Sequence, residues 1–329
     1  MKTINQYISE ALRIKTGANV ISSTKVNNKS ELVNEIIKIT KLGSGDFSHL
    51  KLSNIKNLDL LFTVNEIQQN IVSNKITTID VSGWDTSNII SISEMFYGLT
   101  TIKEIKGLNT WNTSNILSMY GTFHGCESIE ELDLSGWKTN KCEVFSQMFL
   151  DCKQLKTIKG IESFKFKPDA EIELIEFFNN CTALTDCSFV QHWDLSNVQS
   201  LIFTFKNTGI KDLDLSKCNI KDELLDCTGI CANCTHLETF NGLKNILKNA
   251  RYLDSMFLNC ESLKTIIDSP KKIDLQDLES AEKMFSGCSQ LKLDASNWII
   301  SNDSDLNEMF KGTNPEILLT PKNYNRYFK

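Results

Sequence analysis

An aromatic residue recurs along the chain at intervals of 25 to 29 residues, and this period restricts the fold more than any other feature. We call this position the marker. A fixed period of this length is the signature of a repeat protein, in which each unit stacks only on its neighbours. The sequence therefore predicts a solenoid of about nine coils rather than a globular domain with one central core. The marker is held by Phe96, Phe123, Phe149, Phe178, Phe205, Phe257, Phe285 and Phe310, with Cys231 between Phe205 and Phe257.

Two further positions keep a fixed distance from the marker. Side chains that recur at one position of every coil form the shared core of a solenoid, so we expect ladders of buried rings and thiols. Twelve residues before the marker lies a tryptophan slot, which holds all five tryptophans: Trp84, Trp111, Trp137, Trp193 and Trp298. Three residues after the marker lies a cysteine slot, held in six coils by Cys126, Cys152, Cys181, Cys234, Cys260 and Cys288.

Each coil changes its hydrophobic period once. Segments such as 131–135 and 212–216 alternate apolar and polar residues, which predicts a short half-buried strand. The following segment, for example 86–96, places Ser or Asn before apolar residues at helical spacing. We therefore expect a strand, a turn and a short helical segment in each coil. Stacked coils then give an α/β solenoid with a parallel sheet on one face and short helices on the other.

The two ends of the chain depart from the repeat. We expect amphipathic helices at 4–14 and 30–40, joined by a polar linker at 15–29. Terminal units of a repeat protein are atypical because they must cap the core. The predicted organisation is an N-terminal helical segment and linker (1–45), a capping coil (46–78), the repeat solenoid (79–313) and a C-terminal cap (314–329).

Charge and hydropathy exclude several classes of partner. The net charge of −6 and the pI near 5.4 provide no basic surface for nucleic acid. No run reaches the ~18–20 apolar residues of a membrane span. The first residues lack the apolar core of a signal peptide, so we expect a cytoplasmic or virion-associated protein. An odd count of eleven cysteines without an export signal predicts reduced thiols.

The segment CTGICANC is the strongest candidate for a metal or redox site. It brings Cys227, Cys231 and Cys234 close in sequence, with Cys218 and His236 nearby, and a CxxC pair is a known zinc or redox pattern. However, Cys231 fills the marker position and Cys234 the cysteine slot, which favours packing as small apolar side chains. Zinc or redox chemistry is the alternative, and disulfides between adjacent coils are a further one. We expect no cofactor and no metal.

The sequence also gives no sign of a catalytic site. The four histidines fall at unrelated repeat positions: His49, His124, His192 and His236. None shares a coil with a convincing nucleophile and acid, and the glycines are too scattered for a phosphate-binding loop. We therefore expect that the protein is not an enzyme.

The exposed positions of the predicted strands are the remaining candidates for function. One interpretation is that these residues simply suit an exposed sheet and its turns. The other is an acidic ladder presented to a basic protein partner, because the sheet faces of solenoids provide extended binding surfaces. The candidate binding residues are Asp80, Asp133, Asp214, Asp268 and Asp294.

The coils have the form L-D-L-S-x-W-x-T-S-N-x-x-x-x-x-x-M-F-x-x-C-x-x-L. This pattern closely resembles the BspA-like leucine-rich repeats, including the repeat set of mycoplasma and gut-bacterial surface proteins. The resemblance covers roughly residues 47–315. It implies a right-handed leucine-rich-repeat solenoid that serves in adhesion or protein binding without a catalytic centre.

The first twelve residues, MKTINQYISEAL, look like the start of proteins from tailed bacteriophages of gut Bacteroidales. Three functional hypotheses follow from the sequence. The leading one is a scaffold that binds an unidentified protein through the strand face. The alternatives are a phage virion protein that docks on other virion proteins through residues 1–20, and a cell-surface adhesin-type repeat protein.

Overall fold

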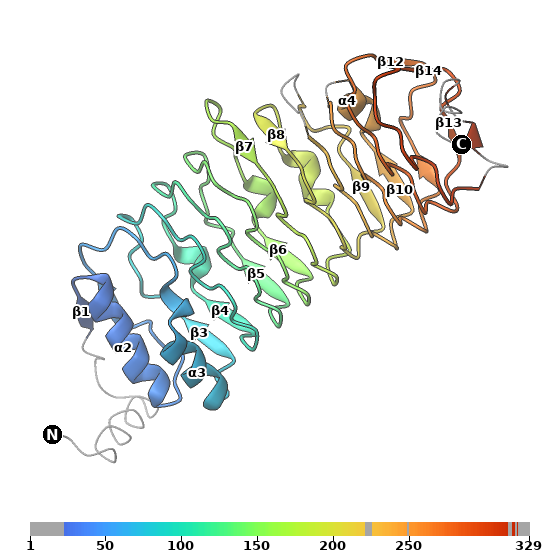
Figure 1. Ribbon diagram of the computed structural model, residues 1–329. Helices are drawn as coiled ribbons and strands as arrows, with labels where there is room; N and C mark the ends of the chain where they lie inside the picture. The colour runs from blue at the N-terminus through green and yellow to red at the C-terminus, as the bar shows by residue number, and fades with distance from the viewer. Residues whose placement is uncertain (1–22, 221–225, 249, 315–317, 320, 322–329) are drawn as a thin grey trace.

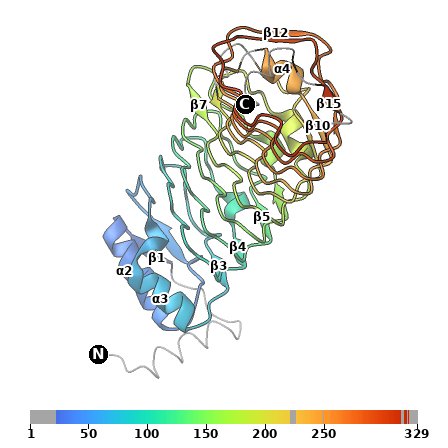
Figure 2. The same ribbon diagram turned by 45° about the vertical axis from the view of Figure 1, so that its right-hand side comes forward.

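The computed structural model describes residues 23–220, 226–248, 250–314, 318–319 and 321. The chain winds into an elongated stack of coils with short parallel strands, seen from the side in Figure 1 and turned by 45° in Figure 2. This architecture confirms the predicted leucine-rich-repeat-like solenoid. None of the helices in the described ranges is long and apolar enough to cross a membrane.

Helix α2 (Lys29–Lys41) lies at the N-terminal end of the stack (Figure 1). The side chain of Asn28 caps it by accepting a hydrogen bond from the Glu31 N–H at 2.9 Å. Leu32 and Ile36 are buried, one turn apart on the face that packs on the solenoid. The helix expected at 30–40 is therefore confirmed, whereas the helix expected at 4–14 lies outside the described residues.

The segment expected to be a linker contains a strand. Strand β1 (Thr24–Val26) pairs in parallel with β2 (Leu50–Leu52) in the first coil. Val26 is buried, while Thr24 and Lys25 are exposed, so this strand buries its last residue and not its central one. The first coil continues with η1 (Leu61–Thr63) and α3 (Asn65–Ser73), and α3 packs against α2.

One side of the solenoid, which we call the strand face, carries the strands of the LDLS segments. Each three-residue strand of this face buries its central residue between outward neighbours, as Ile79 is buried between Thr78 and Asp80. Parallel pairing links β3 to β4, β5 to β6, β9 to β10 to β11, and β13 to β15. The strands are β3 (Thr78–Asp80), β4 (Glu104–Lys106), β5 (Glu131–Asp133), β6 (Thr157–Lys159), β9 (Asp212–Asp214), β10 (Thr239–Asn241), β11 (Thr265–Ile266), β13 (Leu293–Asp294) and β15 (Leu318–Leu319).

Shorter elements occupy the corners and the other sides of the coils. Short helices follow several strands, and two further strand pairs join β7 to β8 and β12 to β14. The helices are η2 (Leu108–Thr110), η3 (Ile161–Ser163), η4 (Ser188–His192) and α4 (Leu243–Leu247). The additional strands are β7 (Ile172–Glu173), β8 (Val198–Ser200), β12 (Ile273–Leu275) and β14 (Trp298–Ile300).

The segments that contain the marker form successive turns and single β-bridges, not the helices expected there. We call the outward side of these segments the turn face. Backbone N–H groups bond to the next coil at every second residue; for example, Gly121 donates to Ser146 O and Phe123 to Met148 O. The residue two before the marker has a positive φ, as in Gln147 (62°) and Ser255 (55°). A left-handed residue there ends any helix before it reaches the marker, which explains the wrong prediction.

The position two residues after the marker also has a positive φ, and its residue types suit it. Glycine pays no steric penalty in this region, while Asn and Asp tolerate it better than other residues. This position is filled by Gly98, Gly125, Asp151, Asn180, Asn207, Asn233, Asn259, Gly287 and Gly312.

The core consists of rings stacked from coil to coil, and every residue assigned to the three ladders is buried. The ring of Phe123 lies 5.5 Å from that of Phe96 and 5.6 Å from that of Phe149, nearly parallel to both. Trp111 stacks in the same way between Trp84 and Trp137, at 6.3 and 6.2 Å. Aromatic burial of this extent dominates core energetics, so the ladders hold the coils in register.

Except for Trp111 Nε1, the tryptophan N–H groups and the thiols of the cysteine slot donate to the backbone of a preceding coil. Trp137 Nε1 donates to Leu108 O at 2.9 Å. Cys126 Sγ donates to Phe96 O at 3.2 Å, so the thiol reaches the marker carbonyl one coil earlier. The other five residues of the cysteine slot repeat this contact. All eleven cysteines are buried free thiols.

Candidate functional site

One of the two interpretations of the strand face was an acidic ladder, and lysines interrupt it beside two of the candidate aspartates. In parallel register, Asp80 lies opposite Lys106 and Asp133 opposite Lys159, so the charges alternate along these pairs. Lys159 also forms an ion pair with Glu131. The sequence shows which residues face outward, but a row of one charge forms only where outward residues of adjacent coils share that charge.

Four of the candidate aspartates shape the turn after their own strand. In each, Oδ1 accepts a hydrogen bond from the backbone N–H two residues later, which is an Asx turn. The Ser135 hydroxyl lowers the pKa of Asp133, and the Ser296 hydroxyl lowers that of Asp294. The donor–acceptor pairs are Ser82 to Asp80, Ser135 to Asp133, Ser216 to Asp214 and Ser296 to Asp294.

Asp268 has a different role. Its Oδ1 accepts from the N–H groups of Gly242 and Leu243 at 2.8 and 3.0 Å, and its Oδ2 accepts from Lys244 at 3.1 Å. These N–H groups belong to the start of α4, where free donors need a partner. Asp268 therefore caps α4 from the next coil and does not lie in a row with the other four.

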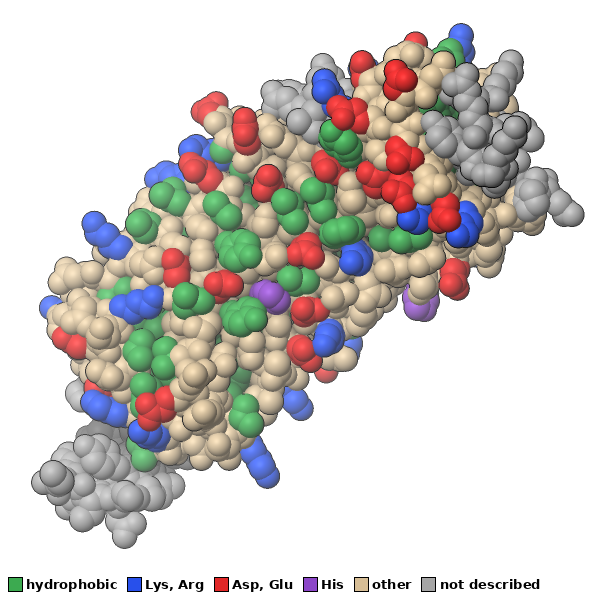
Figure 3. Space-filling model, viewed as in Figure 1, with side chains coloured by type: hydrophobic (Ala, Val, Ile, Leu, Met, Phe, Trp, Pro, Cys, Tyr) green, Lys and Arg blue, Asp and Glu red, His purple; other side chains and the backbone are tan. Residues whose placement is uncertain are grey.

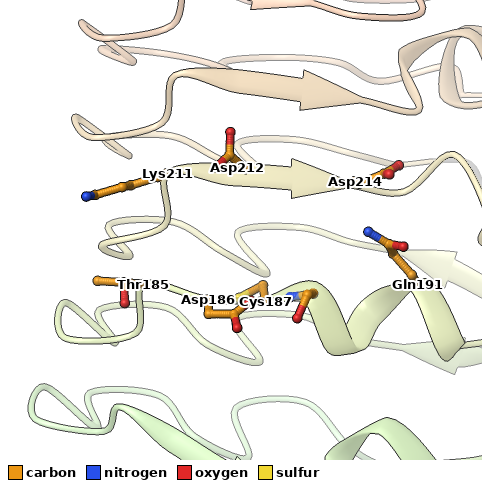
Figure 4. Close-up of a pocket in the computed structure, with 8 residues that line it drawn as sticks. Thr185, Asp186, Cys187, Gln191, Lys211, Asp212 and Asp214 are labelled. Carbon is orange, nitrogen blue, oxygen red and sulfur yellow. Dashed lines mark hydrogen bonds between the residues drawn. The ribbon is translucent and has the colours of Figure 1, made fainter.

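The strand face is interrupted between β6 and β9. Residues 185–187 lie in the intervening coil but pair with neither strand, and η4 begins directly after them. Asp186 Oδ1 accepts from the Ser188 N–H at 2.8 Å, which turns the chain into η4 instead of extending a strand. The interruption leaves a hollow of about 430 Å³ between this segment, η4 and β9 (Figure 4).

The hollow, which we call the sheet break, is mainly acidic. Asp186, Asp212 and Asp214 line it together with the single cation Lys211 and the amide of Gln191. Asp186 and Asp212 are exposed, and Asp212 also accepts a hydrogen bond from the Thr239 hydroxyl. Carboxylates grouped around a hollow attract a basic side chain, and a hollow of this volume can receive one.

Sequence reasoning found Asp214 but missed the site itself. Asp186 and Gln191 become neighbours of β9 only because their coil lacks a strand. The available signal was the segment TDCS at 185–188, which has Thr185 and Cys187 in place of the two leucines of the LDLS pattern.

The thiols of the CTGICANC segment take part in packing. Cys234 Sγ donates to Phe205 O at 2.9 Å, and the Cys231 carbonyl accepts from Cys260 Sγ at 3.0 Å. Burial raises the pKa of Cys227 and Cys231, which disfavours the thiolate that binds metal. Across the ranges that the structure describes, no group of three or more His, Cys, Asp or Glu residues could hold a metal ion.

The coils, ladders and parallel strands define a solenoid of the leucine-rich-repeat class. The family described as "Mycoplasma protein of unknown function, DUF285" matches residues 65–185 and 172–316. The chain therefore belongs to this family, which confirms the resemblance to BspA-like repeats of the mycoplasma type. No curated protein matches the chain.

Two solved structures match the chain at low identity. A leucine-rich repeat protein from Eubacterium ventriosum is 10% identical, with a TM-score of 0.35, and the match covers 85% of this chain and 86% of that one. A leucine-rich repeat protein from Bacteroides ovatus is 16% identical, with a TM-score of 0.27, covering 78% and 81%. Superposition at these scores is loose, so the assignment rests on the family match.

Proposed function

We propose that the chain is a non-catalytic scaffold that binds a protein partner through its strand face, with the sheet break at the centre of the contact. The observation that carries this proposal is the grouping of Asp186, Asp212 and Asp214 around an open hollow. Elsewhere on the face, Lys–Glu pairs between adjacent coils neutralise much of the charge, as Lys156–Glu130 and Lys264–Glu238 do.

The partner best suited to the sheet break presents a Lys or Arg side chain. An arginine can bond two carboxylate oxygens at once, and charge complementarity of this kind sets specificity and association rate. The solenoid then provides a rigid, extended platform on either side of the hollow. No step of this proposal requires a nucleophile, a metal or a cofactor.

Charge reversal tests the proposal. The partner is captured with the wild-type chain from lysate of the source organism, identified, purified and titrated against variants by calorimetry. We expect the double variant Asp186→Lys with Asp212→Lys to bind at least about tenfold more weakly, because it places like charges in the contact. The control Glu35→Lys, on α2, changes the same type of charge away from the strand face and should stay within about twofold.

An affinity of the double variant within about twofold of wild type would refute the strand face as the contact surface, provided that circular dichroism shows both variants folded. The phage hypothesis concerns residues 1–20, outside the described part of the chain, and stays a prediction. The adhesin-type alternative likewise stays a prediction.

A further inference from the structure

Asn241 and Gly242 form the only Asn-Gly dipeptide in the sequence. Asparagine is a thermolabile residue, and glycine after it favours deamidation because no side chain hinders attack of the glycine nitrogen on the asparagine amide. Asn241 is the last residue of β10 and is half-buried, while Gly242 lies at the corner where α4 begins. The strand face therefore carries one dipeptide that is prone to a chemical change.

The fold requires glycine at this corner. Gly242 has φ of 113°, in the left-handed region that L side chains rarely adopt. A Cβ there would lie 2.9 Å from the Leu215 carbonyl carbon, closer than Cβ atoms approach backbone. Gly107 and Gly160 occupy the equivalent corners after β4 and β6, and each follows a lysine. Of these three corners, only the one after β10 combines the required glycine with a preceding asparagine.

Asp268, from the next coil, holds the nitrogen that would attack. Its Oδ1 accepts from the Gly242 N–H at 2.8 Å and from Leu243 at 3.0 Å, and its Oδ2 accepts from Lys244 at 3.1 Å. Attack requires the Gly242 nitrogen to lose its proton, and a carboxylate so close disfavours the negative charge that results. Asp268 therefore opposes the reaction in addition to capping α4.

The side chain that would change lies beside the sheet break. In parallel register Asn241 is opposite Asp214, and its amide is hydrogen bonded to the Asp214 carboxylate. Asp214 lines the sheet break together with Asp186 and Asp212. Conversion of Asn241 to aspartate would replace a hydrogen-bond donor by a second carboxylate, and like charges directly opposite each other repel. The reaction would thus enlarge the acidic group of the sheet break.

We propose that Asn241 is a latent deamidation site, restrained by Asp268, whose reaction adds a carboxylate to the border of the sheet break. Solvent removes the Gly242 N–H proton, and the nitrogen forms a bond to Asn241 Cγ. The Cγ–Nδ2 bond then breaks, and solvent returns a proton as ammonia leaves, which gives a succinimide. Water adds to either ring carbonyl and opens the ring to aspartate or isoaspartate. Water is the only co-reactant, and no group is oxidised or reduced.

The added charge would act locally. The chain already has a net charge of −6, and carboxylates gather near the C-terminal end of the face seen in Figure 3, so one more changes the overall field little. Exposed charges are largely screened beyond about 10 Å, which limits the effect to the surroundings of Asn241. A basic side chain in the sheet break would meet an additional carboxylate. This consequence rests on the proposed function, whereas the restraint by Asp268 does not.

Ageing of the full-length chain tests the restraint. Wild type and Asp268→Ala are incubated in warm, mildly alkaline buffer, and peptide mapping by mass spectrometry follows conversion of the Asn241 amide to an acid. We expect Asp268→Ala to react at least about tenfold faster, because the carboxylate that disfavours loss of the Gly242 proton is gone. Asp268→Asn keeps an oxygen acceptor without the charge and should react at an intermediate rate.

Matched controls separate this effect from general destabilisation. Asp133→Ala removes an aspartate from a turn of the same face, in a sheet that does not include β10, and should leave the Asn241 rate within about twofold of wild type. Wild type unfolded in urea gives the unrestrained rate. Circular dichroism verifies that each variant is folded. Equal rates in wild type and folded Asp268→Ala, or a native rate equal to that of the unfolded chain, would overturn the restraint.

Asn241→Asp reproduces the aspartate product and tests its effect on binding. We expect it to bind the purified partner up to about fivefold more tightly than wild type, as one exposed ion pair allows. Unchanged or weaker binding would refute the link between Asn241 and the sheet break, provided that the double variant Asp186→Lys with Asp212→Lys binds more weakly than wild type. If that double variant binds normally, the proposed function itself has failed, and the ageing experiment still decides the restraint.

Discussion

The strand face and the turn face belong to the same coils but differ in how the backbone forms them. On the strand face, extended residues alternate inward and outward, and pairs such as Lys156–Glu130 link adjacent coils. On the turn face, every coil uses two left-handed residues around the marker, and apolar side chains such as Leu117 remain exposed. The strand face therefore has regular backbone pairing and ion pairs between coils, whereas the turn face has left-handed backbone residues and exposed apolar side chains.

We expect the largest change in the free energy of unfolding from raising the pH, because this deprotonates thiols of the cysteine ladder, which is buried beneath the turn face. Burial raises the pKa of Cys126 and Cys288 to about 12. Above pH 9 the unfolded chain releases thiol protons that the folded chain keeps, so the free energy of unfolding falls as pH rises. Each such thiol should contribute about 1.4 kcal/mol per pH unit.

Urea denaturation between pH 8 and 11 measures this slope. The control is Cys126→Thr, because Thr208 and Thr313 fill the same slot in other coils. We expect this variant to reduce the slope by the contribution of one thiol. An unchanged slope would mean that Cys126 is not buried as a neutral thiol.

Substitution by the β-branched residue valine should destabilise the turn face more than the strand face. Ser255 has φ of 55° on the turn face, while Thr265 is an exposed residue of strand β11. We expect Ser255→Val to lower the free energy of unfolding by about 1–3 kcal/mol, because a β-branched residue is strained at positive φ. Thr265→Val should change it by less than about 0.5 kcal/mol.

The same urea experiment at neutral pH checks both variants. Ser255→Gly serves as the control, since glycine adopts positive φ without steric cost and should not reproduce the loss. Equal losses for Ser255→Val and Thr265→Val would contradict the difference in backbone between the faces.

Removal of an exposed ion pair on the strand face should have the smallest effect on stability. Lys264 Nζ lies 2.7 Å from Glu238 Oε2, and both side chains are about half exposed. Solvent and salt screen such a pair, so Lys264→Ala should shift the urea midpoint much less than Ser255→Val. Repeating the measurement in about 1 M salt should remove the remaining difference. A shift that persists in salt would show that the pair is structural.

The interior of the solenoid could be predicted from sequence, but the turn face could not. Trp111, Phe123 and Cys126 recur in register, so their burial follows from the repeat alone. The residues two before the marker, such as Glu94 and Ser255, share no chemical property that announces a positive φ. Gly, Asn or Asp two residues after the marker was a readable signal, because these types favour left-handed backbone.

The candidate sites depended on contacts between coils. Ile90 and Leu117 are ordinary apolar residues in the sequence, and only the pairing of coils makes them neighbours. The sheet break likewise depends on residues 185–187 failing to pair with β6 and β9. A repeat pattern predicts what adjacent coils share, whereas the proposed contact lies where one coil departs from the pattern.

Hydrogen–deuterium exchange of the chain with its purified partner tests the central proposal most directly. Amides of η4 and β9, around Asp186 and Asp212, should exchange more slowly in the complex than in the free chain. Protection confined to the termini, with unchanged exchange throughout the strand face, would contradict the proposal that the sheet break is the centre of the contact.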